Sequence, residues 1–268
     1  MRPSRSGVRV RSTPARRRPN IRRSRIGNTA RNGSYTTARA TGGRVERVER
    51  HVRRLIRDAA RLELPLPNAA DVERLLVDSA RETLGTGDGI VRMEWSRNGN
   101  EPPELIALPR PIGIEKEVWR AAQSKAIHPG PERRRNTKYV AVDVYDIARA
   151  EVKVEGAGID EVLLFDTDGM LVEGGRSNFL VVLESGPLVT PDRALGSVEG
   201  LGLTIVLESL PEITFTGLRY DDVAAARELM SVNAVRGVVP IVELDGRRIG
   251  DGQPGIWSRR LLPLFRSV

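Results

Sequence analysis

Residues 158–178 read GIDEVLLFDTDGMLVEGGRSN, and this stretch decides much of the fold. It holds two apolar runs on either side of Asp168-Gly169, a pair that favours a two-residue hairpin turn. A third apolar run, residues 178–184, is followed by Ser185-Gly186 and by a fourth run, residues 188–190. The stretch therefore predicts a meander of short antiparallel strands in the C-terminal half.

On both sides of this meander, apolar residues recur every three or four positions, which predicts amphipathic helices. The helices expected are 45–62, a second one up to Leu84 capped by Asn68 or Asp71, a short one around Glu115–Ala126, one from Val142 to Glu155, and others starting near Gly200 and Tyr220. The strands expected are Ser34–Thr37, Ile90–Trp95, Glu104–Leu108 and Val238–Leu244, which Asp245-Gly246 turns into a hairpin. The fold class predicted from these elements is α+β.

The clearest break in these patterns is His128-Pro129-Gly130-Pro131, because proline and glycine interrupt helices and strands alike. We therefore expect an N-terminal α+β domain over residues 34–127, an interdomain linker over residues 128–135 and a C-terminal domain over residues 136–268. Residues 1–33 are rich in Arg, Ser, Pro and Gly and show no periodicity. They are expected to form a disordered arm.

The basic charge is concentrated in this arm. Residues 1–44 hold 13 arginines and no Asp, Glu or Lys, so the other 224 residues carry 30 basic and 35 acidic side chains. The arm has three open interpretations: an organelle transit peptide, a polyanion-binding tail, or an unselected upstream extension. No apolar run approaches the roughly 18 residues of a membrane span. A chain with no cysteine and two histidines also offers little to a metal centre, and none is expected.

Lysine is rare in this chain, with four lysines against 39 arginines. An amine can lose its proton and form a Schiff base, which a guanidinium cannot do. Lys138 ends the run Arg133-Arg134-Arg135-Asn136-Thr137-Lys138, between the predicted linker and a predicted helix. The run is either a solvated basic surface or the site of a reactive lysine.

Glu173 and Arg54 can each be an ordinary structural residue or part of a ligand-binding site. Glu173 precedes Gly174-Gly175, and a carboxylate in such a turn can bind a protonated ring nitrogen. The alternative is a polar β-turn without a ligand. His51, Arg54 and Leu55 share one helix face. Arg54 could therefore point inward and bind an anion such as phosphate, or it could be a surface arginine.

Taken in order, these residues resemble the fold-type IV (class IV) pyridoxal-phosphate enzymes: branched-chain and D-amino-acid aminotransferases and 4-amino-4-deoxychorismate lyase. The matching segments are Gly33-Ser34-Tyr35-Thr36-Thr37-Ala38-Arg39, His51 to Leu55, Lys138 with Gly156, Tyr145-Asp146 with Ala148-Arg149, residues 158–178, Gly200-Leu201 and Asn233-Ala234-Val235-Arg236-Gly237.

The resemblance implies the two-domain fold of D-amino-acid aminotransferase, with a smaller N-terminal α/β sandwich and a larger C-terminal pseudo-barrel that binds pyridoxal 5'-phosphate (PLP). It implies that Lys138 is the catalytic Schiff-base residue, that Glu173 pairs with the pyridine nitrogen, and that Arg54 binds the phosphate. Further cofactor contacts are expected from Asn178, Leu201, Gly202, Asn233 and Ala234, and substrate contacts from Tyr35, Arg39 and Arg176.

The function expected is therefore that of a class IV PLP-dependent aminotransferase acting on an amino acid and a keto acid. The first alternative is 4-amino-4-deoxychorismate lyase, which serves 4-aminobenzoate and folate synthesis on the same fold. The second is a nucleic-acid-binding protein that acts through the arginine-rich arm. Members of this family are usually homodimers, so the resemblance implies a homodimer. We expect a cytoplasmic protein without a membrane partner, or an organellar one if the arm is a transit peptide.

Overall fold

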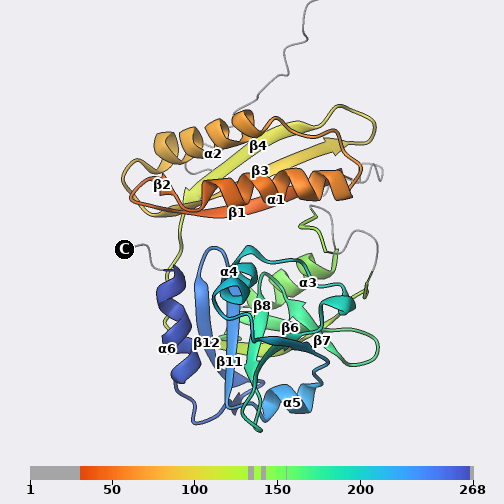
Figure 1. The fold of residues 1–268 in the computed structure, drawn as a ribbon, viewed down its shortest axis with the longest axis vertical. Coiled ribbons are helices and arrows are strands. Elements are labelled where there is room, and N and C mark those ends of the chain that lie inside the picture. The colour runs from red at the N-terminus through yellow and green to blue at the C-terminus, as the bar shows by residue number, and fades with distance from the viewer. Residues whose placement is uncertain (1–30, 132–135, 140–142, 155, 266–268) are drawn as a thin grey trace, which may run out of the picture. The chain divides into compact units, whose positions relative to one another are not determined.

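The computed structural model describes residues 31–131, 136–139, 143–154 and 156–265. The predicted arm lies outside the described residues as far as residue 30, and so do residues 132–135 of the predicted linker. The chain divides into two compact units, drawn in Figure 1. The first unit comprises Met1–Gly113 and Lys138–Ala141, and the second comprises Ile114–Thr137 and Val142–Val268.

These units differ from the predicted domains at several places. Residues 114–127 belong to the second unit, because their strand pairs with strands of that unit. Lys138–Ala141, predicted as part of the C-terminal domain, belongs to the first unit. Residues 31–33, assigned from the sequence to the arm, lie in the first strand of the sheet.

The first unit is a sheet with two helices on one face (Figure 1). Its antiparallel strands run in the order β2-β1-β3-β4. The elements are β1 (Arg31–Thr41), β2 (Arg44–Val45), α1 (Val48–Arg61), α2 (Ala69–Leu84), β3 (Gly89–Asn98) and β4 (Glu104–Pro111). One apolar core joins both helices to β1, β3 and β4. The predicted N-terminal α/β sandwich is confirmed.

Local sequence explains where these helices begin. The side chain of Asn68 accepts a hydrogen bond from the Asp71 N–H at 3.1 Å, so the predicted N-cap of α2 is confirmed. Helix α1 begins at Val48 rather than near Val45. Arg44 and Val45 instead pair with the end of β1, and Arg47 has a left-handed φ of 51° that separates the strand from the helix.

The second unit is built on one nine-stranded sheet in the order β10-β9-β8-β11-β12-β5-β6-β7, with β13 paired to β12. Its strands are β5 (Trp119–Ile127), β6 (Glu161–Phe165), β7 (Leu171–Gly174), β8 (Asn178–Val182), β9 (Leu188–Pro191), β10 (Thr214–Thr216), β11 (Glu228–Asn233), β12 (Gly237–Leu244) and β13 (Arg247–Arg248). Its helices are α3 (Asp143–Val152), η1 (Arg193–Leu195), α4 (Leu201–Ser209), α5 (Tyr220–Ala224), α6 (Ile256–Leu261) and η2 (Leu262–Phe265).

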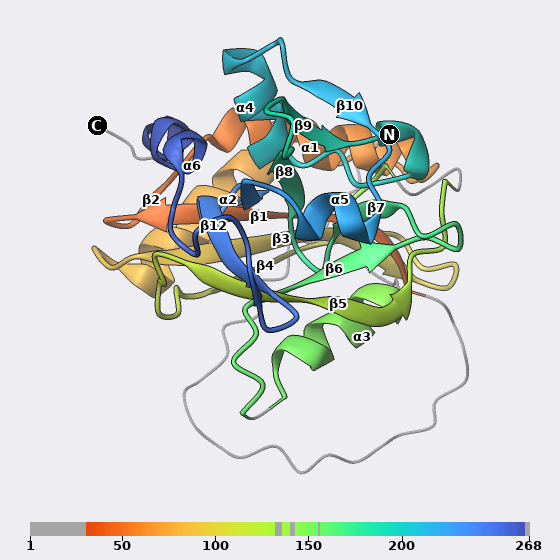
Figure 2. The same ribbon diagram turned by 90° about the horizontal axis from the view of Figure 1, so that it is seen from below.

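This sheet curls around its main core. One buried cluster takes side chains from strands near opposite ends of the order, among them Leu171 of β7 and Val189 of β9. The other face of β8, β11 and β12 packs on α4, α6 and η2. Helix α3 covers β5 and β6, as Figure 2 shows. The predicted pseudo-barrel and the α+β class are thus confirmed.

Two expectations about this sheet were wrong. The segment Glu115–Ala126, predicted as a helix, contains most of β5, because parallel pairing with β6 and β12 overrides the helix propensity of its Ala, Arg and Lys residues. The sheet is also mixed rather than purely antiparallel, since β9 and β10 likewise pair in parallel. In the part of the chain that the structure describes, no helix is long and apolar enough to cross a membrane.

Candidate active site

The backbone of Lys138 is fixed by two elements of the first unit. Its N–H donates to the Asp58 carboxylate at 2.9 Å, and its carbonyl accepts the N–H of Tyr35 at 2.9 Å. Asp58 lies in the last turn of α1 and Tyr35 lies on β1. The next residue, Tyr139, forms a β-bridge with Ser34. Lys138 therefore starts from a rigid main chain, as a reactive lysine requires.

The side chain of Lys138 lies among aromatic and basic groups. Its Nζ is 5.1 Å from the centroid of the Tyr35 ring, and the Arg92 guanidinium carbon is 3.7 Å from the same centroid. Both distances are in the range of cation–π attraction. Tyr35, predicted as a substrate contact, thus lies beside the predicted catalytic lysine.

His51 is a buried neutral histidine in this half of the site. Its side chain is 1% exposed, and its Nδ1 is 2.6 Å from the Thr36 Oγ1. Burial lowers its pKa to about 3, with further lowering by the positive charges of Arg54, Lys138 and Arg47. Three cations therefore act on His51, which adds no charge of its own at neutral pH.

Arg54 lies on the buried face of α1, so the inward orientation considered from the sequence is confirmed. It is 4% exposed, and its Nε is 3.6 Å from Asp58, which is fully buried. Burial lowers the pKa of the Arg54 guanidinium and the charge of Asp58 opposes that change. Asp58 also forms an ion pair with Arg57 at 2.9 Å. One carboxylate thus holds two arginines and the backbone of Lys138.

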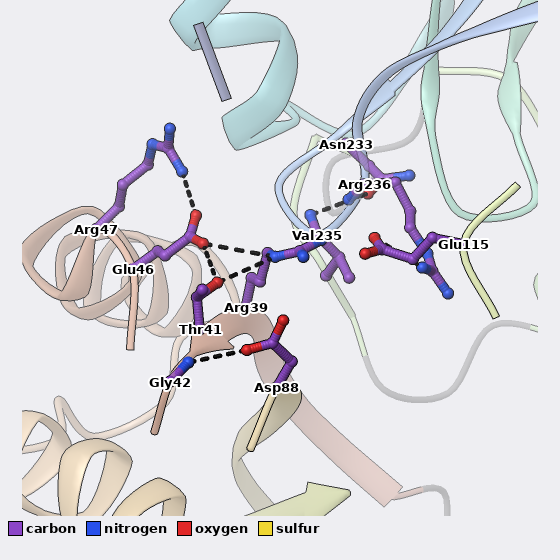
Figure 3. A network of polar contacts seen from close by, with 10 residues as sticks. All are labelled: Arg39, Thr41, Gly42, Glu46, Arg47, Asp88, Glu115, Asn233, Val235 and Arg236. Atoms are coloured by element: carbon purple, nitrogen blue, oxygen red, sulfur yellow. Dashed lines mark hydrogen bonds and ion pairs between the residues drawn. The ribbon is translucent and has the colours of Figure 1, made fainter. Parts of the chain in front are cut away.

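Arg39 lies at the end of β1, in the network drawn in Figure 3. Its Nε donates to the Thr41 Oγ1 at 3.3 Å and is 3.5 Å from a Glu46 oxygen. Glu46 also pairs with Arg47 at 2.8 Å. These contacts hold the turn between β1 and α1, and they give Arg39 a structural role besides the predicted substrate contact.

In the second unit, Glu173 near the end of β7 is a buried carboxylate, 3% exposed, whose partners are all uncharged donors or a histidine. Its Oε1 accepts the hydroxyl of Tyr145 and lies 3.4 Å from the His128 Nε2. Its Oε2 accepts the N–H of Val198 at 3.0 Å. Among the described residues, no arginine or lysine forms an ion pair with it. Such a carboxylate can receive a cationic N–H donor.

The turn after Glu173 is held by a second buried carboxylate, Glu161. Its oxygens accept the N–H of Gly175 at 3.1 Å and the hydroxyl of Ser177 at 2.7 Å. Arg176, predicted as a substrate contact, is half exposed and lies 3.8 Å from the same carboxylate. Burial raises the pKa of Glu161, while Arg176 and the hydrogen bonds oppose the shift. Arg176 therefore has a partner at the start of β6.

The start of α4 brings together most of the other predicted cofactor residues. Asn178 donates to the Val198 carbonyl at 3.0 Å, so the Asn178 and Glu173 side chains both bind the segment that leads into α4. A Cβ on Gly202 would lie 2.6 Å from the backbone carbon of Asn233, so only glycine permits this approach. Leu201 is the first residue of α4, and Ala234 follows Asn233 at the end of β11.

This helix start has the character of an anion site. Its N-cap, Gly200, provides no side-chain hydrogen bond to the first turn, which leaves backbone N–H groups for a ligand. The Asn233 Oδ1 accepts the N–H groups of Val235 and Arg236 at 2.9 and 2.8 Å, which fixes the adjoining turn (Figure 3). A carboxylate for a ring nitrogen and a helix start for a phosphate fit PLP by their donor chemistry.

Several residues near Lys138 and near Glu173 have contacts that the sequence did not indicate. Asp58 lies four positions after Arg54, and that spacing on one helix face could have identified it as a partner. Tyr145 belonged to a matched motif without a role. His128 and Val198 gave no local signal, because both reach Glu173 only through the folded sheet.

Comparison with known proteins agrees with this arrangement. Residues 33–244 match the family model of the class IV amino-transferases. A protein of Methanocaldococcus jannaschii, assigned by its name to the branched-chain-amino-acid aminotransferases, is 26% identical over 253 residues, which cover 88% of this chain and 86% of the relative.

Two solved structures show the same fold. One, from Legionella pneumophila, is assigned by its name to the 4-amino-4-deoxychorismate lyases, with a TM-score of 0.75, 17% identity, and coverage of 87% of this chain and 89% of that one. The other is a "hypothetical aminotransferase" from Mycobacterium tuberculosis in its PLP-bound form, with a TM-score of 0.73, 19% identity and coverage of 87% of each chain. The family match spans most of the sequence, and the chain belongs to the class IV aminotransferases.

Proposed function

We propose that this class IV aminotransferase binds PLP and transfers the amino group of an amino acid to a 2-keto acid. The observation that carries the proposal is the environment of Glu173, a buried carboxylate without an arginine or lysine partner among the described residues, linked through Val198 to the start of α4. The family itself is PLP-dependent, and a buried carboxylate and a helix start with a glycine N-cap support the proposal.

The proposal gives each residue one task. Lys138 binds the cofactor's aldehyde carbon and, once substrate has taken its place, accepts the proton from the substrate Cα on its Nζ. Glu173 holds a proton on the cofactor's ring nitrogen. When bound, PLP supplies an electron sink that makes the Cα–H bond acidic.

Phosphate binding is proposed for Arg54 and for the backbone at Leu201 and Gly202. Asn178, Asn233 and Ala234 support this region by fixing the segments before and beside α4. Tyr35, Arg39 and Arg176 remain proposed substrate contacts, and Tyr35 has the strongest support because its ring lies near the Lys138 amine.

The first test is cofactor binding. Purified protein incubated with PLP should develop a visible absorption band that borohydride fixes to the chain, and Lys138→Ala should abolish the fixed label. Addition of L- or D-amino acids should then bleach the band, and a 2-keto acid should restore it. A colourless protein that takes up no PLP would refute the proposal.

A second candidate, 4-amino-4-deoxychorismate lyase, is kept because Tyr145-Asp146 with Ala148-Arg149 and the segment 233–237 resemble that branch. Both reactions begin with loss of the same Cα proton, so the products distinguish them. Pyruvate released from aminodeoxychorismate without an added keto acid would identify a lyase, whereas amino-group transfer that needs a keto acid would identify an aminotransferase.

Two broader features are proposed with the same activity. A homodimer in the cytoplasm is the assembly and location we propose, and gel filtration with light scattering tests the first of these. The arginine-rich residues 1–30 lie outside the described residues. Removing them should leave PLP binding intact, and any loss of salt-sensitive binding to polyanions would assign that property to the arm.

A further inference from the structure

Three groups from different parts of the second unit meet at one carboxylate oxygen. His128 follows β5, Tyr145 lies in α3 and Glu173 lies in β7. The Tyr145 hydroxyl donates to the Glu173 Oε1, and the His128 Nε2 lies 3.4 Å from both that oxygen and the Tyr145 hydroxyl. His128 is fully buried and Glu173 is 3% exposed, so these contacts are shielded from water.

The proton of His128 can be placed from its other contacts. The N–H of Gly130 donates to the His128 Nδ1 at 3.1 Å, so that nitrogen carries a lone pair. In a neutral imidazole the single proton is then on Nε2, the atom that faces Glu173. The backbone N–H of His128 donates to the Phe165 carbonyl at 2.7 Å, which ties the main chain of His128 to the end of β6.

Helix α3 brings Tyr145 to this position. Val144 and Ala148 on α3 pack against Val162 and Leu164 of β6, and Tyr145 packs at the edge of the same cluster. This packing fixes the position of the Tyr145 side chain. Its hydrogen bond to Glu173 therefore costs little additional side-chain entropy.

Glu173 keeps room for one further donor. A carboxylate has about four lone-pair positions. The Tyr145 hydroxyl and His128 Nε2 approach Oε1, and the Val198 N–H occupies one position on Oε2. None of the three partners is an arginine or a lysine, and together they fix the direction of the carboxylate.

We propose that Tyr145 and His128 are positioning residues that orient the Glu173 carboxylate toward the protonated ring nitrogen of the cofactor. This inference rests on the proposed function, because it requires that Glu173 receives a pyridinium. It predicts that removing either donor weakens only the part of PLP binding that depends on the ring nitrogen.

The experiment compares PLP with its 1-deaza analogue, in which carbon replaces the ring nitrogen. Affinities of both ligands are measured by absorbance titration of the full-length, cofactor-free protein. Wild type should prefer PLP, and Glu173→Gln should remove the preference. Tyr145→Phe and His128→Leu should each reduce the preference about tenfold, the usual effect of a hydrogen bond to a charged group. Binding of the deaza analogue should stay unchanged.

Matched variants separate this role from a structural one. His128→Gln keeps an N–H donor near the Nε2 position and should recover most of the preference. Tyr220→Phe removes another tyrosine hydroxyl that donates to a carboxylate, that of Asp245 at 2.9 Å, and should change neither affinity. Melting temperatures of the cofactor-free proteins show whether each variant folds. If His128→Leu does not fold, Tyr145→Phe still tests the inference.

The outcomes are distinguishable. A wild-type protein that binds neither ligand, or binds both equally, contradicts the proposed function and this inference with it. A wild type that prefers PLP, with Tyr145→Phe and His128→Leu retaining the full preference, leaves the proposed function intact and overturns the inference. Equal losses for both ligands overturn it too, because they would show a packing role only.

Discussion

The two histidines of the chain are both buried, and they lie in different units with opposite surroundings. In the first unit, burial and then the positive charges of Arg54, Lys138 and Arg47 lower the pKa of His51 to about 3. In the second unit, His128 faces the carboxylate of Glu173. His51 therefore lies among positive charges in the first unit, whereas His128 lies beside a carboxylate in the second unit.

The buried carboxylates show the same contrast. Asp58 is in ion pairs with Arg54 and Arg57, so its charge is compensated within the first unit. Among the described residues, Glu173 has no arginine or lysine partner. We therefore expect a substitution at Asp58 to affect stability more than a substitution at Glu173.

The largest effect is expected at Lys138, the residue of the first unit whose amine we propose to be reactive. Lys138→Arg keeps the charge and the backbone contacts with Asp58 and Tyr35 but cannot accept a proton. Transamination should fall by more than about 10³-fold, within the range expected for loss of a general base and nucleophile. Single-turnover absorbance measures this. Lys153→Arg, a change at an exposed lysine, should match wild type; turnover above a tenth of wild type in Lys138→Arg would exclude Lys138 as the base.

The next largest effect should be a difference in the free energy of unfolding between substitutions at Asp58 and at Glu173. Asp58→Asn leaves two arginines facing a neutral amide and should lower the free energy of unfolding by about 3–4 kcal/mol, as when a buried ion pair loses one partner. Glu173→Gln replaces an uncompensated charge and should lower it by about 1–2 kcal/mol. Urea unfolding of the cofactor-free proteins provides both values. Equal losses would show that the two carboxylates do not differ in the way proposed.

The sequence was sufficient wherever neighbours along the chain determine the structure. The turn residues Asp168-Gly169 lie between β6 and β7, and Asn68 caps α2. The position of Arg54 on the same helix face as His51 and Leu55 allowed an inward or a surface orientation, and the structure has the inward one. The turn and the cap depend on residues within a few positions of each other, so local propensity and periodicity were enough to predict them.

Features that depend on distant residues could not be predicted in this way. Strand β5 has helix-favouring residues, and it is a strand because it pairs with β6 and with β12, which lies more than 100 residues later. The contacts of Tyr145 and His128 with Glu173 also require the folded sheet. Their residue types are common, and nothing in the local pattern distinguishes them from surface positions.

A smaller effect should appear as pH dependence at His51. Its pKa is lowered from 6.5 to about 3 in the folded protein, so the unfolded chain binds a proton that the folded chain does not. Stability from this group is present above pH 6.5 and decreases as the pH falls toward 3, by about 1.4 kcal/mol per pH unit. His51→Asn, which keeps a polar atom near Thr36, should remove this slope. Urea unfolding at pH 7 and pH 5 measures it, and an unchanged slope would contradict the assignment.

The smallest effect is expected at Glu161, which contrasts with Asp58 because its only ion-pair partner among the described residues is the half-exposed Arg176. Gln at this position can still accept the N–H of Gly175, and the Ser177 hydroxyl can reverse to accept from the amide. Glu161→Gln should therefore change the free energy of unfolding at pH 7 by less than about 1 kcal/mol.

The pH dependence of Glu161→Gln gives a sharper test. Burial raises the pKa of Glu161 above its ordinary 4.5, so the folded protein keeps a proton that the unfolded chain releases. Wild-type stability from this group is full below pH 4.5 and decreases as the pH rises through the folded pKa, whereas Gln has no such loss. The stability of the variant relative to wild type should increase between pH 4.5 and pH 8. A constant difference over that range would mean that Arg176 and the turn's hydrogen bonds already compensate the charge of Glu161, and its carboxylate would then resemble that of Asp58.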